Sequence, residues 1–116
     1  MTFIQPTSVY LHAAPIDFRK QINGLSVMVQ DAMMLDVFSS SLFVFMNGQH
    51  TRIKILYWDK NGFCLWLKRL EKDKFAWPKN SSSISVALTS QELQWLLEGF
   101  DIFQKPPHKT LQYLSV

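Results

Sequence analysis

Two Asn-Gly pairs in the middle of the chain constrain its fold more than any other feature. They divide residues 42–71, LFVFMNGQHTRIKILYWDKNGFCLWLKRLE, into three runs rich in aliphatic, β-branched and aromatic residues. Asn-Gly between such runs is the strongest short-range signal for a β-hairpin, because a type I′ turn needs positive φ at both central residues. We therefore expect three antiparallel strands, at about residues 42–46, 51–58 and 63–70.

Alternation along these strands defines two faces, and a change of hairpin loop from two to four residues leaves the faces unchanged. The apolar face should be the core face, covered by the first helix. It carries Leu42, Val44, Met46, Ile53, Ile55, Tyr57, Cys64, Trp66, Lys68 and Leu70. The opposite face, called the mixed face below, carries Phe43, Phe45, Arg52, Lys54, Leu56, Trp58, Phe63, Leu65, Leu67 and Arg69.

Two interpretations of the mixed face stay open. Cations beside aromatic rings are typical of nucleic-acid binders, in which the cations neutralise phosphates and the rings stack on bases. Alternatively, the second helix covers the aliphatic end of this face, while the arginines and Lys54 extend to solvent along their apolar stems.

Shorter elements are expected on both sides of the three strands. Residues 8–14 alternate as a short strand, and Asp17 is a candidate N-cap for a helix of about four turns. The apolar stripe of that helix is Phe18, Ile22, Leu25, Val29 and Met33. Residues 74–78 (KFAWP) and 83–88 (SISVAL) are candidate edge strands. A capping box from Thr89 to Glu92 predicts a second helix, with Gly99 just beyond its end.

These elements predict an α+β fold: an antiparallel β-meander of three to five strands, an amphipathic N-terminal helix packed on one face and a short C-terminal helix. A chain of 116 residues that is 47% hydrophobic can form one core. We expect a single domain over residues 1–101 and a C-terminal tail or arm over residues 102–116. The single cysteine fits a reducing compartment, and no leader or apolar run of about 18 residues appears, so the expected location is cytoplasmic, away from membranes.

The positive charge is concentrated in one segment. Arg52 to Lys79 contains eight cations against three anions, a net charge of +5, whereas the whole chain carries +3. Charge runs at strand ends are also common as plain solvated surface. The candidate nucleic-acid contacts are Arg52, Lys54, Trp58, Lys68, Arg69, Lys72, Lys74, Phe75 and Trp77. Arg19 and Lys20, close to the predicted helix start, are a candidate anion site, although Asp17 as a plain N-cap explains the same residues.

No pattern in the chain indicates catalysis. The acidic residues are few, and each has a local explanation as cap, turn or helix-surface residue, whereas a metal-dependent nuclease needs acids that converge on metal ions. The histidines are isolated, with no second ligand at a metal-binding spacing. We therefore expect no enzyme, no cofactor and no metal; a hidden nuclease using Asp17 or Asp59 is the weakest alternative.

Long stretches of the sequence resemble one known family. The order AAPIDFRKQINGL, SLFVFMNG, RIKILYWDKNGFCLWLKRLE, KFAWP and LTSQELQWLLEGFD, within residues 8–101, is similar to the Orf2-like accessory proteins, called TnpB, of the insertion-sequence family numbered sixty-six. The family-like positions are Asp17, Arg19, Lys20, Asn23, Gly24, Leu25, Lys54, Leu56, Tyr57, Trp58, Asp59, Asn61, Gly62, Phe63, Cys64, Leu65, Trp66, Lys68, Arg69, Leu70, Glu71, Phe75, Trp77 and Pro78. The chain departs from the family pattern at Gln21, residues 47–50 and Ala76, where relatives usually have glycine or arginines.

The resemblance implies a non-catalytic accessory protein for DNA transposition, encoded beside a separate transposase. Expected partners are the DNA ends of the element, the transposase and other element-encoded proteins, with a homo-oligomer as a further possibility. The alternative is a protein-interaction module that docks the transposase or a second copy through the mixed face, without binding DNA.

Overall fold

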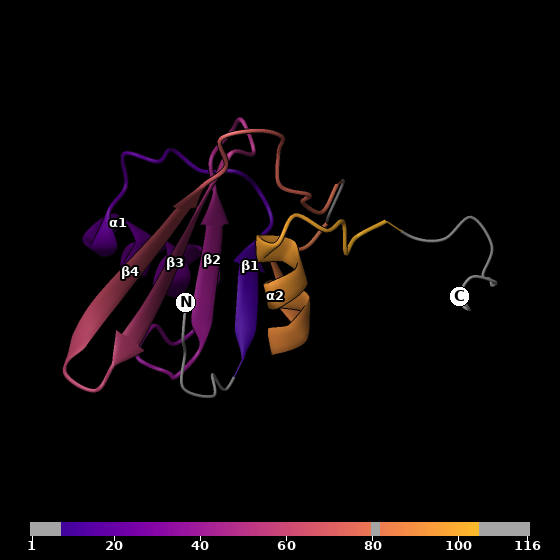
Figure 1. Ribbon diagram of the computed structural model, residues 1–116. Helices are drawn as coiled ribbons and strands as arrows, with labels where there is room; N and C mark the ends of the chain where they lie inside the picture. The colour runs from indigo at the N-terminus through magenta and orange to yellow at the C-terminus, as the bar shows by residue number, and fades with distance from the viewer. Residues whose placement is uncertain (1–7, 80–81, 105–116) are drawn as a thin grey trace.

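The computed structural model describes residues 8–79 and 82–104. Five strands form one sheet in the order β4-β3-β2-β1-β5, with helices on its two faces (Figure 1). The elements are β1 (Val9–His12), α1 (Ile22–Val27), the π-helical turn η1 (Met28–Ala32), β2 (Leu42–Met46), β3 (Arg52–Asp59), β4 (Gly62–Arg69), β5 (Ser85–Leu88) and α2 (Ser90–Leu97). The α+β class and the three central strands are confirmed.

The sheet is mostly antiparallel, with one exception. β2, β3 and β4 form the predicted meander, and β5 pairs antiparallel with β1. β1, however, runs parallel to β2, because the chain between them crosses over through α1 instead of turning back in a hairpin. Residues 74–78, predicted as an edge strand, contain no strand.

The two hairpin loops differ from the expected Asn-Gly turns. In the first loop, the side-chain oxygen of Asn47 accepts hydrogen bonds from the main-chain N–H groups of Thr51 and Arg52, at 2.9 Å each, and so closes a loop over residues 47–51. In the second, Gly62 already pairs with Asp59, so the two-residue loop consists of Lys60, which has a φ of 53°, and Asn61. The strand residues still lie on the predicted faces, because the pairing registers keep the alternation of the strands in phase.

The two helical layers are exchanged relative to the prediction. Leu25 and Val29 of the first helical segment pack on Phe43, Phe45 and Leu56, which belong to the mixed face. The prediction that this helix covers the apolar face is therefore wrong. The helix can cover the mixed face because the central cation of that face, Lys54, forms hydrogen bonds with the main-chain carbonyls of Phe18 and Lys20.

α1 also begins later than the sequence predicts. Its N-cap is Gln21, and Asp17 instead accepts a hydrogen bond from the main-chain N–H of Arg19 at 2.9 Å, so the N-cap prediction for Asp17 is wrong. Phe18 lies outside the helix, although its ring still packs against the same cluster as Ile22.

α2 covers the apolar face. Leu93, Leu96 and Leu97 are buried in a cluster with Val44 and Ile55 of the sheet. The capping box is present in both directions between Thr89 and Glu92. Gly99, at φ +99°, follows the C-cap, and the helix end is closed by hydrogen bonds from the N–H of Gly99 to Leu96 and from that of Phe100 to Trp95, a Schellman motif.

Beyond α2, Ile102 and Phe103 pack against the same apolar cluster. The predicted tail, residues 102–116, lies mostly outside the described residues, so the domain boundary stays a prediction. Among residues 8–79 and 82–104, no helix is long and apolar enough to cross a membrane.

Candidate nucleic-acid interface

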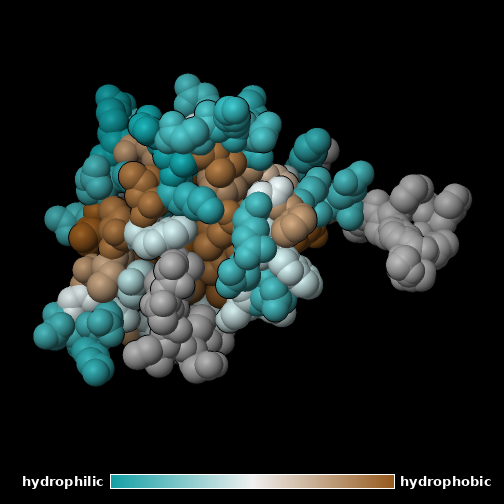
Figure 2. Space-filling model, in the orientation of Figure 1, coloured by the Kyte–Doolittle hydropathy of each residue, from teal (hydrophilic) through white to brown (hydrophobic). Residues whose placement is uncertain are grey.

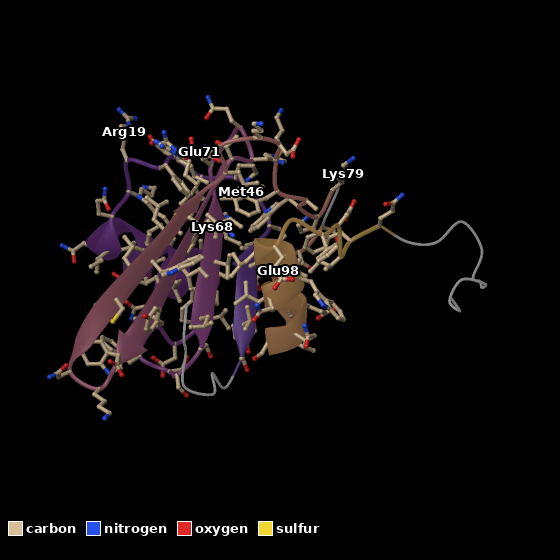
Figure 3. The ribbon with its side chains drawn as sticks, viewed as in Figure 1. Arg19, Met46, Lys68, Glu71, Lys79 and Glu98 are labelled. Carbon is tan, nitrogen blue, oxygen red and sulfur yellow. The ribbon has the colours of Figure 1, made fainter. Side chains whose placement is uncertain are left out.

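Six exposed cations gather at one end of the domain, which we call the basic end. They are Arg19, Lys20, Arg52, Arg69, Lys72 and Lys74. Arg52 and Arg69 face each other across β3 and β4, and the N–H of Phe75 bonds to the carbonyl of His50 at 2.7 Å, which ties the loop after β4 to the first hairpin loop. Figure 2 shows hydrophilic side chains along this end, at the top of the view, and Figure 3 shows Arg19 and Glu71 there.

Lys54 brings the segment before α1 to this end. Its Nζ donates to the carbonyl oxygens of Phe18, at 2.9 Å, and Lys20, at 2.8 Å, and lies 4.7 Å from the centre of the Phe18 ring. Only 6% of Lys54 is exposed. Burial, and to a smaller extent the nearby Arg52, lowers the pKa of the Lys54 ammonium. Its predicted role as a solvent-facing phosphate contact is therefore corrected: Lys54 is a buried tether.

Lys68 is likewise engaged within the fold. Its Nζ donates to the carbonyl oxygen of Leu97 at 2.8 Å, at the end of α2, where a cation also interacts favourably with the helix dipole. In Figure 3, Lys68 lies on the side of the sheet that α2 covers. The sequence-based grouping of Lys68 with Arg69 is corrected, because neighbouring strand residues point to opposite faces.

The predicted aromatic contacts do not lie exposed beside these cations. Phe75 and Trp77 are only 2% and 5% exposed, and the indole N–H of Trp77 donates to the carbonyl of Ala13 at 3.0 Å. Trp58 is half-buried near the far end of β3, six residues from Arg52, or about 20 Å along the strand. The expectation of exposed rings within the basic patch is thus wrong, because these rings fill the core or the opposite end.

Charge at the basic end is only partly neutralised. Asp17 and Glu71 pair with Arg19 and Arg69, at 2.6 Å and 3.0 Å. The hydrogen bonds from Arg19 lower the pKa of Asp17 to about 2. Within the described part of the chain, no hydrogen bond or ion pair engages the side-chain nitrogens of Lys20, Arg52, Lys72 and Lys74.

Arg52, which has no ion-pair partner among the described residues, stands directly opposite Arg69. Like charges opposite each other across two strands destabilise a sheet. Counting Asp17, Glu71 and Asp73 as the local acids, the basic end carries a net charge of +3. This arrangement can accept an anion that contacts several cations at once.

The family of the chain follows from its sequence. The model for the IS66 Orf2-like proteins matches residues 7–107. The chain belongs to this family. Two relatives from Sinorhizobium fredii (strain NBRC 101917 / NGR234) are similar: the uncharacterized protein y4hO, 30% identical over 84% of each chain, and the uncharacterized protein y4jC, 33% identical over 75% of this chain and 74% of the relative. No solved structure matches the chain. Membership supports an accessory role in transposition.

One feature of this IS66 Orf2-like protein was not predicted from the sequence. Phe38, 55% exposed, joins Trp58 and Phe63 in an aromatic trio, with ring centres 5.0 to 5.6 Å apart. Phe38 stands in the loop before β2, and the only sequence signal for it is a large apolar residue within a polar stretch. Among the described residues, no group of three or more His, Cys, Asp or Glu side chains could hold a metal ion.

Proposed function

We propose that this IS66 Orf2-like protein is a non-catalytic accessory factor for DNA transposition that contacts the DNA ends of its element through the basic end. The observation that carries the proposal is the group of exposed cations held together by the β3–β4 hairpin and the tethered segment 17–20. Four of them have no partner within the described residues, so their charge is available to phosphates.

The expected binding mode is contact with the phosphate backbone. The exposed cations at this end are lysine and arginine side chains, and the rings that could have stacked on bases are buried or lie at the other end. Contact with phosphates releases counterions, so affinity should fall linearly in a plot of log K against log salt, with a slope of about −0.9 per phosphate contacted.

The experiment is fluorescence anisotropy of labelled element-end DNA and of a scrambled duplex, titrated at several salt concentrations. Changing Arg52 and Lys72 to Gln should reduce the magnitude of the salt slope by about 2, because two phosphate contacts are lost. The matched control changes Lys60 and Lys79 to Gln, which removes the same charge from two exposed positions that do not belong to the group of six cations. The proposal would be contradicted if both double variants weakened DNA binding equally, or if the wild-type protein did not bind DNA at low salt.

A second candidate function is supported by a different observation. Apolar side chains remain exposed on the part of the mixed face that α1 leaves uncovered: Leu67 on β4 is 55% exposed, and Phe38 of the trio is equally so. In this candidate, the protein docks the transposase or another copy of itself without touching DNA. Co-purification with the transposase in high salt, lost in Leu67→Lys and retained in Ile84→Lys, would favour docking.

A further inference from the structure

The outer edge of β4 is unusually open for an edge strand. β4 is eight residues long and pairs with β3 without interruption from Arg52↔Arg69 to Asp59↔Gly62. It contains no proline and no bulge, and Gly62 to Leu67 carry no charge. Natural edge strands are normally protected by a proline, a bulge or charged side chains, because an exposed apolar edge is a template for another strand. Figure 2 shows hydrophobic surface at the left of the view, where β4 and α1 lie.

The register identifies which main-chain groups are free. The N–H of Leu70 bonds to the carbonyl of Thr51 at 2.8 Å, so Thr51 and Leu70 form a hydrogen-bonded pair of the antiparallel ladder. Such pairs alternate along a ladder, so Cys64, Trp66 and Lys68 also direct their main-chain groups toward β3. Phe63, Leu65, Leu67 and Arg69 direct theirs outward, where no described strand pairs with them.

We propose that two copies of the chain associate through β4, in antiparallel register with Trp66 opposite Trp66 of the second copy. In this register Leu65 faces Leu67, and Phe63 faces Arg69. All four outward residues then find partners, with about eight main-chain hydrogen bonds. A shift of the two-fold axis to Leu65 or Leu67 leaves Arg69 or Phe63 unpaired. The result is a closed two-fold dimer with one continuous ten-stranded sheet.

Charge and side-chain chemistry favour antiparallel over parallel pairing of the two copies. The strand carries its cations at one end, Lys68 and Arg69, and aromatic rings at the other, around Phe63. A parallel pair would place like charges opposite each other, which is unfavourable. The antiparallel pair places Arg69 beside the aromatic trio, whose ring faces attract cations. It also buries Leu67, one of the most exposed apolar side chains of the sheet.

β5, the other edge, offers a poorer surface. It has only four residues, Ser85–Leu88, and starts with a serine. Ile84 lies just before it and is 54% exposed, nearly the same as Leu67 at 55%. Ile84→Lys and Leu67→Lys therefore place the same new charge at matched exposure, one at each edge of the sheet.

The test begins with sedimentation velocity of the whole protein over a range of concentrations in high salt, without DNA. The expected result is a dimer that Leu67→Lys converts to monomer, a twofold loss of mass, while Ile84→Lys leaves the dimer intact. A wild-type protein that stays monomeric, or equal effects of the two variants, would overturn the proposal. The result is independent of DNA binding, which is measured separately.

Cysteine cross-linking then tests the register. Opposed residues of a non-hydrogen-bonded antiparallel pair have Cα atoms about 4.5 Å apart, within disulfide range. Trp66→Cys in a Cys64→Ser background should therefore form a disulfide-linked dimer on oxidation, and Leu65→Cys in the same background should not. The natural Cys64 would lie four residues, about 13 Å, from its copy and should stay unlinked. Efficient linking of the wild type through Cys64 or of the Leu65→Cys variant, or no linking of the Trp66→Cys variant, would overturn the register.

Discussion

The ammonium of Lys68, on β4, lies 2.8 Å from the carbonyl oxygen of Leu97, the last residue of α2. The bond joins the sheet to the end of the helix that covers it. Lys68→Met should lower the free energy of unfolding by about 1–2 kcal/mol, because a charge-assisted bond and a favourable helix-dipole contact are lost. Urea denaturation measures this, with Lys79→Met, at an exposed position, as the control. The salt dependence of DNA binding should change less in Lys68→Met than in Arg52→Met. An equal change in the two variants would indicate that Lys68 contacts DNA.

Lys54 should matter more for stability than its neighbour Arg52. Lys54→Met leaves the carbonyl oxygens of Phe18 and Lys20 without their donor, so we expect a loss of about 2–3 kcal/mol, against less than about 0.5 kcal/mol for the exposed Arg52→Met. Thermal or urea unfolding of both variants checks this.

The pH dependence from Lys54 has a defined sign. The pKa of this ammonium is lowered in the folded protein from an ordinary 10.5, chiefly by burial. Between the lowered value and 10.5, the unfolded chain binds more protons, so the contribution of this group to stability rises with pH. Wild type should therefore show this rise in alkaline unfolding experiments, and Lys54→Met should lack it. An identical pH profile for the two proteins would contradict the assignment.

Asp17 should stay ionised well below the pH at which an ordinary aspartate is protonated. Its pKa is about 2, against an ordinary 3.8, because Arg19 donates to it. Because the folded pKa is depressed, the contribution of the pair to stability is complete above pH 3.8 and is lost as the pH falls through about 2. NMR titration of the Asp17 carboxyl measures this. Arg19→Gln should return the pKa toward 3.8, whereas Lys20→Gln should shift it only slightly.

A new cation in the first hairpin loop should strengthen DNA binding. A Cβ at Gly48 would meet no atom within 4 Å, and the same is true at Gly62, which lies at the opposite end of β3. Gly48→Arg should steepen the salt slope by about 0.9, because one more phosphate can be contacted, and Gly62→Arg should not. Anisotropy titrations compare the two. A larger gain from Gly62→Arg would place the DNA surface at the opposite end of the domain.

The strands and their faces could be predicted from the sequence, whereas the pairing of faces with helices could not. Alternation in 42–46 and 52–59 depends only on local geometry, so Val44 and Ile55 were placed correctly on one face and Phe45 and Lys54 on the other. Which helix covers each face depends on the crossover from β1 to β2 and on partners for Lys54 that lie 34 and 36 residues away. No local pattern records such contacts.

The candidate site could likewise be predicted only in part. Exposure of Arg52, Lys72 and Lys74 agrees with the prediction of a charged strand end. The roles of Lys54 and Lys68 within the fold could not be predicted, because a lysine that reaches a main-chain carbonyl has the same sequence signature as one that faces water. Phe75 and Trp77 were misjudged because neighbouring charges made a buried segment resemble surface.

Lys54 and Lys68 project from opposite faces of a single hairpin, and each forms hydrogen bonds 29 or more residues away in the chain, Lys54 with the segment that leads into α1 and Lys68 with the end of α2. This implies an order of assembly. The hairpin is local, with a two-residue loop, and can form early, whereas both helical contacts require the slower closure of long chain segments. As the chain leaves the ribosome from its N-terminus, β1 and α1 emerge first, yet they have no finished surface to pack on until β2 and β3 have followed.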